Sequence, residues 1–214
     1  MIEVEPATFI KANINKEIVD KLNPLFIRAG NSAISKIQTA VFNALTSAPE
    51  YQALLPGGSL YNQIGNPDIE SDLLTIINEI LKHITIDSVF RAITANRNYL
   101  VGHYSINIVR ADFKDILAMP EATFMTEKGS LLKWLEWILL EGNNDIIIGF
   151  TYVDIFSPRS RTGKGLMVHS NNENWSVPEY QGTINSNWIT IAMNTIEPIL
   201  LQSIEDTFRN ILNS

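Results

Sequence analysis

The stretch YLVGHYSINIVR, residues 99–110, decides the fold class, because its apolar side chains recur at every second position. The alternation is clearest at Tyr104, Ile106 and Ile108. A period of two places these side chains on one face of a β-strand. ITIDSVFRAI, residues 84–93, has a similar pattern and precedes it across the turn sequence TANRN. The two stretches therefore predict an antiparallel pair of strands with one covered face.

A second pair of strands is expected nearer the C-terminus. NDIIIGFTYVDIF, residues 144–156, and GLMVHS, residues 165–170, flank a short basic loop. Two apolar stretches joined by a short turn are typical of a β-hairpin. Together with the first pair they predict an antiparallel sheet of about four strands.

Two long amphipathic segments flank the strands. Apolar side chains recur every three or four residues over residues 16–45 and again over residues 186–212, which is the period of an α-helix. Pro24 is expected to kink the first helix or to mark its start, and Pro198 to interrupt the second. A third helix is expected over residues 69–83, directly after the start signal NPD.

A short helix over SLLKWLEWILLEG, residues 130–142, ended by Gly142, completes the expected elements. Trp134 and Trp137 on this helix are expected to pack in the core. The chain is therefore predicted to be α+β, with an antiparallel sheet of about four strands packed with a long N-terminal and a long C-terminal helix. Its length of 214 residues fits a single domain over residues 1–214, helical at both ends.

The composition excludes several classes of protein. With 45% hydrophobic and 18% charged residues the chain has the balance of a soluble protein, and no apolar run approaches the roughly 18 residues of a membrane span. The acidic, amphipathic first residues do not resemble a secretory signal, so export is not expected. The absence of cysteine excludes disulfides, thiolate zinc sites and a cysteine nucleophile. A net charge of −7 disfavours general binding to nucleic-acid phosphates.

SPRSRTGKGLMV, residues 157–168, has part of the pattern of a phosphate-binding loop but lacks its essential residues. Such a loop needs a glycine six residues before the lysine, where this chain has Pro158, which has no N–H to donate. It also needs a hydroxyl for magnesium directly after the lysine, where this chain has Gly165. Nucleotide binding is therefore not expected.

The same stretch is the most concentrated basic feature of an acidic chain. Its cations are Arg159, Arg161 and Lys164, on the expected hairpin tip. They can face either the phosphates of DNA or an acidic surface on another protein. The protein partner is favoured, because the rest of the chain would repel DNA.

Residues that carry catalysis or bind metals show no familiar arrangement in this sequence. The histidines, His83, His103 and His169, lie far apart, and none stands in an HExxH motif. The sequence contains no GxSxG motif, and its carboxylates are scattered. We therefore expect no enzymatic activity, no metal and no cofactor.

The polar stretch NWSVPEYQGTINSNWIT, residues 174–190, contains an unusual set of apolar and aromatic side chains before the final helix. They are Trp175, Pro178, Tyr180 and Trp188. Tryptophan and tyrosine dominate binding energy at protein interfaces, so one interpretation is a contact with a neighbouring subunit. The other is a loop folded back on its own chain. Of the two, we predict the first, so that these four residues lie at the interface with a neighbouring subunit and Trp188→Ala gives a folded chain that assembles poorly.

These motifs, in this order, resemble those of the neck or tail-completion proteins of tailed bacteriophages, of the phage lambda Z type. Members often contain EWLL.G, SRTG..MV and VP..FAGT..NNFITRA, which correspond here to Glu136–Leu140, Ser160–Val168 and Val177–Ala192. Gly57–Asp68 is similar to a segment usually written G.LR.ELG. The resemblance covers about the last two thirds of the chain. Tyr61 and Ile191 replace the arginines usual in the family, so charge contacts made there by relatives are not expected here.

The resemblance implies a structural subunit of the virion at the head-to-tail junction, assembled in the host cytoplasm. It implies a homo-oligomeric ring of six copies around the DNA channel, in contact with adjoining connector and tail proteins and with DNA as a possible further partner. A tail terminator, which caps the tail tube with a similar ring, is the alternative within the same class. A small nucleic-acid-binding module that uses RSRTGK is the alternative from a different class.

Overall fold

The computed structural model describes residues 7–89, 103–107, 113–126, 129–177 and 179–212. The chain divides into two compact units. Unit 1 comprises Met1–Thr39, Ile84–Ile108 and Pro198–Ser214, and unit 2 comprises Ala40–His83 and Val109–Glu197. That the whole chain forms a single domain stays a prediction.

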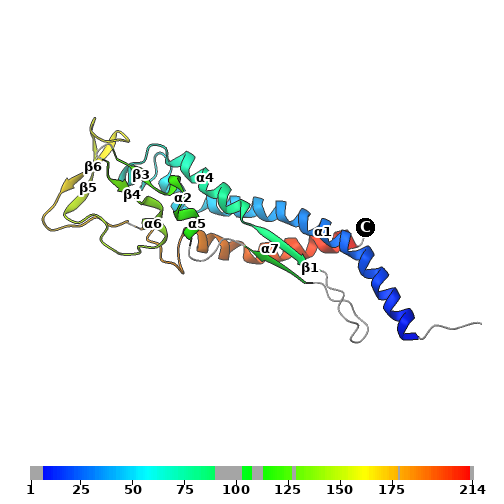
Figure 1. Cartoon of the computed structure of the whole chain (residues 1–214). Helices are drawn as coiled ribbons and strands as arrows, with labels where there is room; N and C mark the ends of the chain where they lie inside the picture. The colour runs from blue at the N-terminus through cyan, green and yellow to red at the C-terminus, as the bar shows by residue number, and fades with distance from the viewer. Residues whose placement is uncertain (1–6, 90–102, 108–112, 127–128, 178, 213–214) are drawn as a thin grey trace, which may run out of the picture. The chain divides into compact units, whose positions relative to one another are not determined.

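Helices and strands are both present, so the predicted α+β class is confirmed (Figure 1). The α-helices are α1 (Ala7–Ser47), α2 (Pro49–Leu54), α3 (Tyr61–Ile64), α4 (Ile69–Lys82), α5 (Lys114–Leu117), α6 (Trp134–Leu139) and α7 (Trp188–Leu212), with a 3-10 turn η1 (Pro120–Ala122). The strands are β1 (Thr85–Val89), β2 (His103–Asn107), β3 (Phe124–Met125), β4 (Leu131–Leu132), β5 (Phe150–Phe156) and β6 (Lys164–His169).

The prediction of one sheet of about four strands is wrong for the described part of the chain. The strands form three separate antiparallel pairs, β1–β2, β3–β4 and β5–β6. No described strand of one pair is hydrogen-bonded to a strand of another pair. Alternation identifies a strand, but it does not identify which strands become neighbours.

The long helices extend through both of their prolines. Pro24 lies inside α1, which begins nine residues before the predicted start at Lys16 and ends close to the predicted end. The predicted interruption at Pro198 is wrong, because α7 continues through it to Leu212. A proline inside a helix removes one hydrogen bond and costs about 3 kcal/mol. Buried side chains on both sides, Ile196 and Leu200, offset that cost by continuing the apolar stripe.

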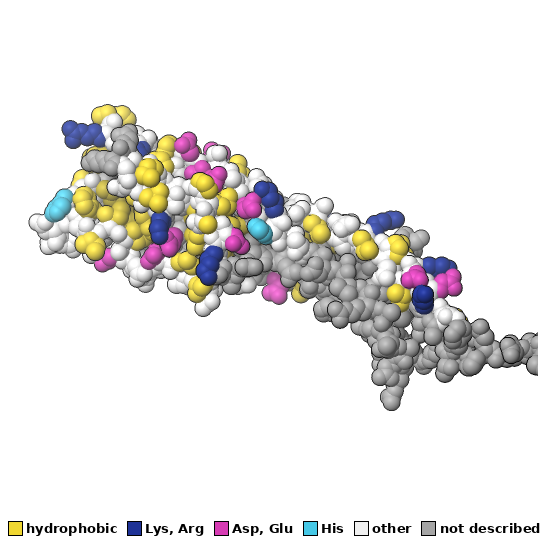
Figure 2. Space-filling view, viewed as in Figure 1, with side chains coloured by type: hydrophobic (Ala, Val, Ile, Leu, Met, Phe, Trp, Pro, Cys, Tyr) yellow, Lys and Arg dark blue, Asp and Glu magenta, His cyan; other side chains and the backbone are white. Residues whose placement is uncertain are grey.

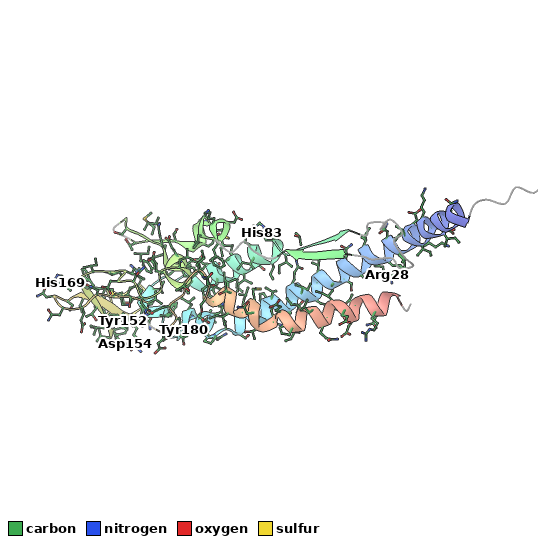
Figure 3. All side chains as sticks on the ribbon, turned by 90° about the horizontal axis from the view of Figure 1, so that it is seen from below. Arg28, His83, Tyr152, Asp154, His169 and Tyr180 are labelled. Atoms are coloured by element: carbon green, nitrogen blue, oxygen red, sulfur yellow. The ribbon has the colours of Figure 1, made fainter. Side chains whose placement is uncertain are left out.

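Within unit 1, α1 and α7 run side by side (Figures 1 and 3). The Lys36 ammonium donates a 3.0 Å hydrogen bond to the Thr207 hydroxyl across the pair. Buried positions recur along both helices at helical spacing: Ala29, Ala33 and Ile37 on α1, with Leu200 and Ile204 on α7. The predicted pairing of β1 with β2 is confirmed, while their connecting turn TANRN lies outside the described residues.

Unit 2 has its own core around α4 and α6. The helix predicted over residues 69–83 is confirmed as α4, whose buried side chains are Ile69, Leu73, Ile76, Ile77 and Ile80. The helix predicted over residues 130–142 is shorter, because Leu131 and Leu132 pair with β3 instead. Trp134 is fully buried, as predicted, and its indole nitrogen donates a 2.9 Å hydrogen bond to the Glu121 carbonyl.

No helix in the described part of the chain combines the length and the apolar character needed to cross a bilayer.

Candidate protein-interaction site

The β5–β6 hairpin carries the predicted basic loop, residues 157–163, between two paired strands. The pairing runs from Phe150 opposite His169 to Phe156 opposite Lys164, with an irregularity between Val153 and Phe156. Figure 3 shows Tyr152, Asp154 and His169 together on this hairpin. The strand pair predicted from the two apolar stretches is therefore confirmed, although β5 begins only at Phe150.

Gly165 lets the two strands of the hairpin come together. It has a φ of +89°, and a Cβ at this position would collide with the Tyr152 ring. Only glycine can adopt this positive φ and also leave the space that the Tyr152 ring occupies without strain. The glycine that argues against a magnesium-binding loop therefore has a structural role, which is to make room for Tyr152.

Arg161 fastens the loop to helix α3. Its Nε donates a 2.7 Å hydrogen bond to the Gly65 carbonyl, and Nη2 donates a longer one of 3.4 Å to Ile64. The guanidinium carbon also lies 5.1 Å from the centre of the Phe124 ring. The arginine expected to face a partner thus makes contacts inside its own chain, and reversing its charge would disturb the hairpin.

Lys164 also interacts within the hairpin. Its ammonium lies 3.2 Å from the Asp154 carboxylate, and both side chains are more than half exposed, so the pair contributes little to stability. The Tyr152 hydroxyl donates a 3.4 Å hydrogen bond to the same carboxylate. Burial, with a smaller effect from Asp154, raises the pKa of Tyr152 and keeps this hydroxyl protonated.

Arg159 differs from the other two cations of the loop. Its backbone N–H donates to the Ser157 hydroxyl at 3.2 Å, while the side chain is exposed. Among the residues whose positions the structure describes, none forms an ion pair with its guanidinium. Arg159 is therefore the loop cation best placed for a partner.

An exposed apolar surface accompanies this arginine. Phe156, beside the loop, is 86% exposed and Ile148, before β5, is 76% exposed. The exposed large hydrophobic residues of the hairpin and its approach are Ile148, Phe150, Ile155, Phe156 and Val168. Hydrophobic side chains gather on the face of the molecule over β5 and β6 (Figure 2). Grouped apolar exposure of this kind marks sites of protein interaction.

The aromatic segment before α7 is largely internal. Trp175 is buried, donates a 3.0 Å hydrogen bond to the Gln63 side chain and packs edge-on against Trp137 at 5.6 Å. Trp188 is 1% exposed. Trp175 and Trp188 therefore pack against their own chain, as the second interpretation of this segment proposed. Tyr180 is half-buried, and Pro178 lies outside the described residues.

Sequence reasoning identified the basic loop but missed the apolar surface next to it. The available signal was the consecutive pair Ile155 and Phe156, since neighbouring residues in a strand point to opposite faces. A ribbon of two strands with apolar residues on both faces leaves part of them uncovered unless other elements enclose it.

The two histidines whose side chains are described, His83 and His169, lie in different surroundings. His83 lies 3.3 Å from the Glu79 carboxylate, His169 packs edge-on against Phe150, and the His103 side chain lies outside the described residues. Within the described ranges, no group of three histidine or acidic side chains could hold a metal ion.

Comparison of the chain with family models, with curated proteins and with solved structures found no match.

Proposed function

We propose that this chain is a structural subunit of the bacteriophage head-to-tail connector. In this role it forms a ring that completes the tail and joins it to the head. The observation that carries the proposal is the β5–β6 hairpin, which presents exposed Phe156 and Arg159 while Arg161 fixes its loop to α3. A ring subunit needs surfaces for its neighbours.

The sequence resemblance supplies the biological context for this surface. SRTGKGLMV, one of the segments that resemble the neck proteins, spans most of the loop and all of β6 except its last residue, His169. The same segment thus supports the family resemblance and belongs to the exposed hairpin. This overlap favours a partner-binding role for the hairpin in a virion protein.

The test is a lysate of the encoding phage in which this gene is inactivated. The proposal predicts filled heads and finished tails that remain unjoined, and joining when the wild-type protein is supplied. Tails of irregular length would instead favour the tail terminator, which caps the tube. Normal particles would contradict both virion roles.

The nucleic-acid-binding alternative has its own measurement. A module that binds through RSRTGK would bind duplex DNA with an affinity that falls steeply as salt rises. The connector proposal predicts that the isolated protein has no such affinity at moderate salt, because Arg161 and Lys164 already interact within the chain.

A further inference from the structure

Helix α4 exposes one leucine that its own core does not use. The buried side chains of α4 are Ile69, Leu73, Ile76, Ile77 and Ile80, whereas Leu74 is 37% exposed. Glu70 is exposed and stands four residues earlier, so the two side chains share one face of the helix. No lysine or arginine of the described residues forms an ion pair with Glu70. This face, which we call the α4 outer face, combines an apolar contact with an unpaired carboxylate.

The hairpin has the opposite charge beside a similar apolar group. Phe156 is largely exposed, and Arg159 lies three residues further along the loop without an ion-pair partner in the described structure. Phe156 and Leu74 both belong to unit 2, yet each remains exposed in a single chain. They therefore do not cover each other within one copy.

We propose that the β5–β6 hairpin of one copy binds the α4 outer face of a second copy, with Phe156 against Leu74 and Arg159 against Glu70. This inference rests on the proposed function, because a ring requires contacts between like subunits. The apolar pair supplies the buried contact, and the charged pair fixes its orientation.

A second copy fits this surface better than DNA does. DNA would pair with Arg159 but would leave Phe156 without an apolar partner, and a chain of net charge −7 repels it. The two surfaces also differ from each other. A contact between different surfaces of like subunits is heterologous, and such contacts generate rings when the rotation closes.

The first experiment measures the association of the purified full-length chain by sedimentation over a range of concentrations. The wild type is expected to associate, and Phe156→Ser or Leu74→Ser to weaken association by about tenfold or more, as for a central interface residue. The matched control is Ile184→Ser, which removes an exposed apolar side chain from neither surface. Circular dichroism establishes that each variant is folded. If Phe156→Ser does not fold, the association of Leu74→Ser alone tests the contact.

The second experiment exchanges the two charges. Arg159→Glu and Glu70→Arg should each weaken association, whereas the chain with both changes should recover it to near the wild-type level. Arg28→Glu is the control, because Arg28 is an exposed arginine of α1 on neither surface (Figure 3). A monomeric wild type, or a doubly changed chain no better than the single variants, would overturn the inference.

Failure here is distinguishable from failure of the proposed function. A chain that stays monomeric in solution, but whose loss leaves heads and tails unjoined, would overturn this contact and keep the connector role. Normal particles without the gene would overturn the connector role, while recovery by charge exchange would still support the contact.

Discussion

The indole nitrogen of Trp188 donates a 3.0 Å hydrogen bond to the carbonyl oxygen of Leu45, which ties the first turn of α7 to the last turn of α1. Carbonyls in the last turn of a helix have no partner within the helix, so the indole satisfies one of them. The Trp188 ring also lies 6.1 Å from that of Tyr51, at a tilt of 37°. A residue that the sequence marks as a possible interface aromatic therefore holds two helices together.

Truncation of Trp188 should destabilise the folded chain. We expect Trp188→Ala to lower the free energy of unfolding by about 3–5 kcal/mol, because it leaves a large cavity. Trp188→Phe keeps most of the volume but leaves the Leu45 carbonyl without this donor, at a cost of about 1–3 kcal/mol. Urea denaturation measures both values. A Trp188→Ala protein as stable as the wild type would show that this side chain is not part of the core.

Arg161 should control the order of the hairpin. Arg161→Ala removes the hydrogen bonds to Gly65 and Ile64, so amide hydrogens of β5 and β6 should exchange faster while α4 keeps its protection. Arg161→Lys should restore only part of the protection, because lysine lacks the planar guanidinium. Arg28→Ala, which removes an exposed arginine of α1 far from the hairpin in the sequence, is the control and should leave exchange in β5 and β6 unchanged. Equal effects of the two alanine variants would contradict the assignment of Arg161 as the residue that fixes the loop.

Substitutions at Gly163 and Gly165 allow the cost of backbone strain to be measured apart from the cost of a steric collision. Both have positive φ, +80° and +89°, but a Cβ on Gly163 meets open space, whereas one on Gly165 collides with Tyr152. Gly163→Ala should therefore cost about 1 kcal/mol of strain, and Gly165→Ala clearly more. Thermal denaturation compares them directly. Equal melting temperatures of the two variants would contradict the collision between a Cβ at residue 165 and the Tyr152 ring.

Asp72 should make stability depend on pH. Burial raises the pKa of its carboxyl above the usual value near 3.8, against the opposing hydrogen bond from Asn66, and Asp68 and Glu121 raise it further. The folded chain then holds this proton more tightly than the unfolded chain. The protonated carboxyl of Asp72 therefore adds fully to the free energy of unfolding below about pH 3.8. This contribution is lost as pH rises through the pKa of the folded chain.

Asp72→Asn should remove this dependence, because asparagine does not titrate and can still accept from Asn66. The free energy of unfolding of the wild type minus that of the variant should fall as pH rises above about 3.8. Urea titrations at several pH values give this difference. A difference that stays constant, or that grows with pH, would contradict the raised pKa.

The sequence predicted the elements whose signals are local. The period of the apolar residues located α4 within one residue of its ends, and the alternation around Tyr104 and Ile106 located β2. Local rules failed where distant contacts decide. Pro198 should break α7 by its own geometry, but the apolar stripe continues on both sides of it.

The candidate site was predictable only in part. The three cations of the loop are visible in the sequence, but their different roles are not, because Gly65 lies 96 residues from Arg161 along the chain. Likewise, Phe156 and Leu73 are both apolar residues within regular elements, yet one is 86% exposed and the other is buried. Which elements pack together decides that difference, and periodicity does not encode it.

Native mass measurement of the purified protein and of the assembled phage decides whether this chain is a ring-forming virion subunit. A ring-forming subunit should give one closed species at an integral multiple of the 24.0 kDa chain mass, and the same number of copies in each particle. The resemblance to neck proteins implies six copies. A protein that remains at 24.0 kDa in solution and is missing from purified particles would contradict a ring-forming role in the virion.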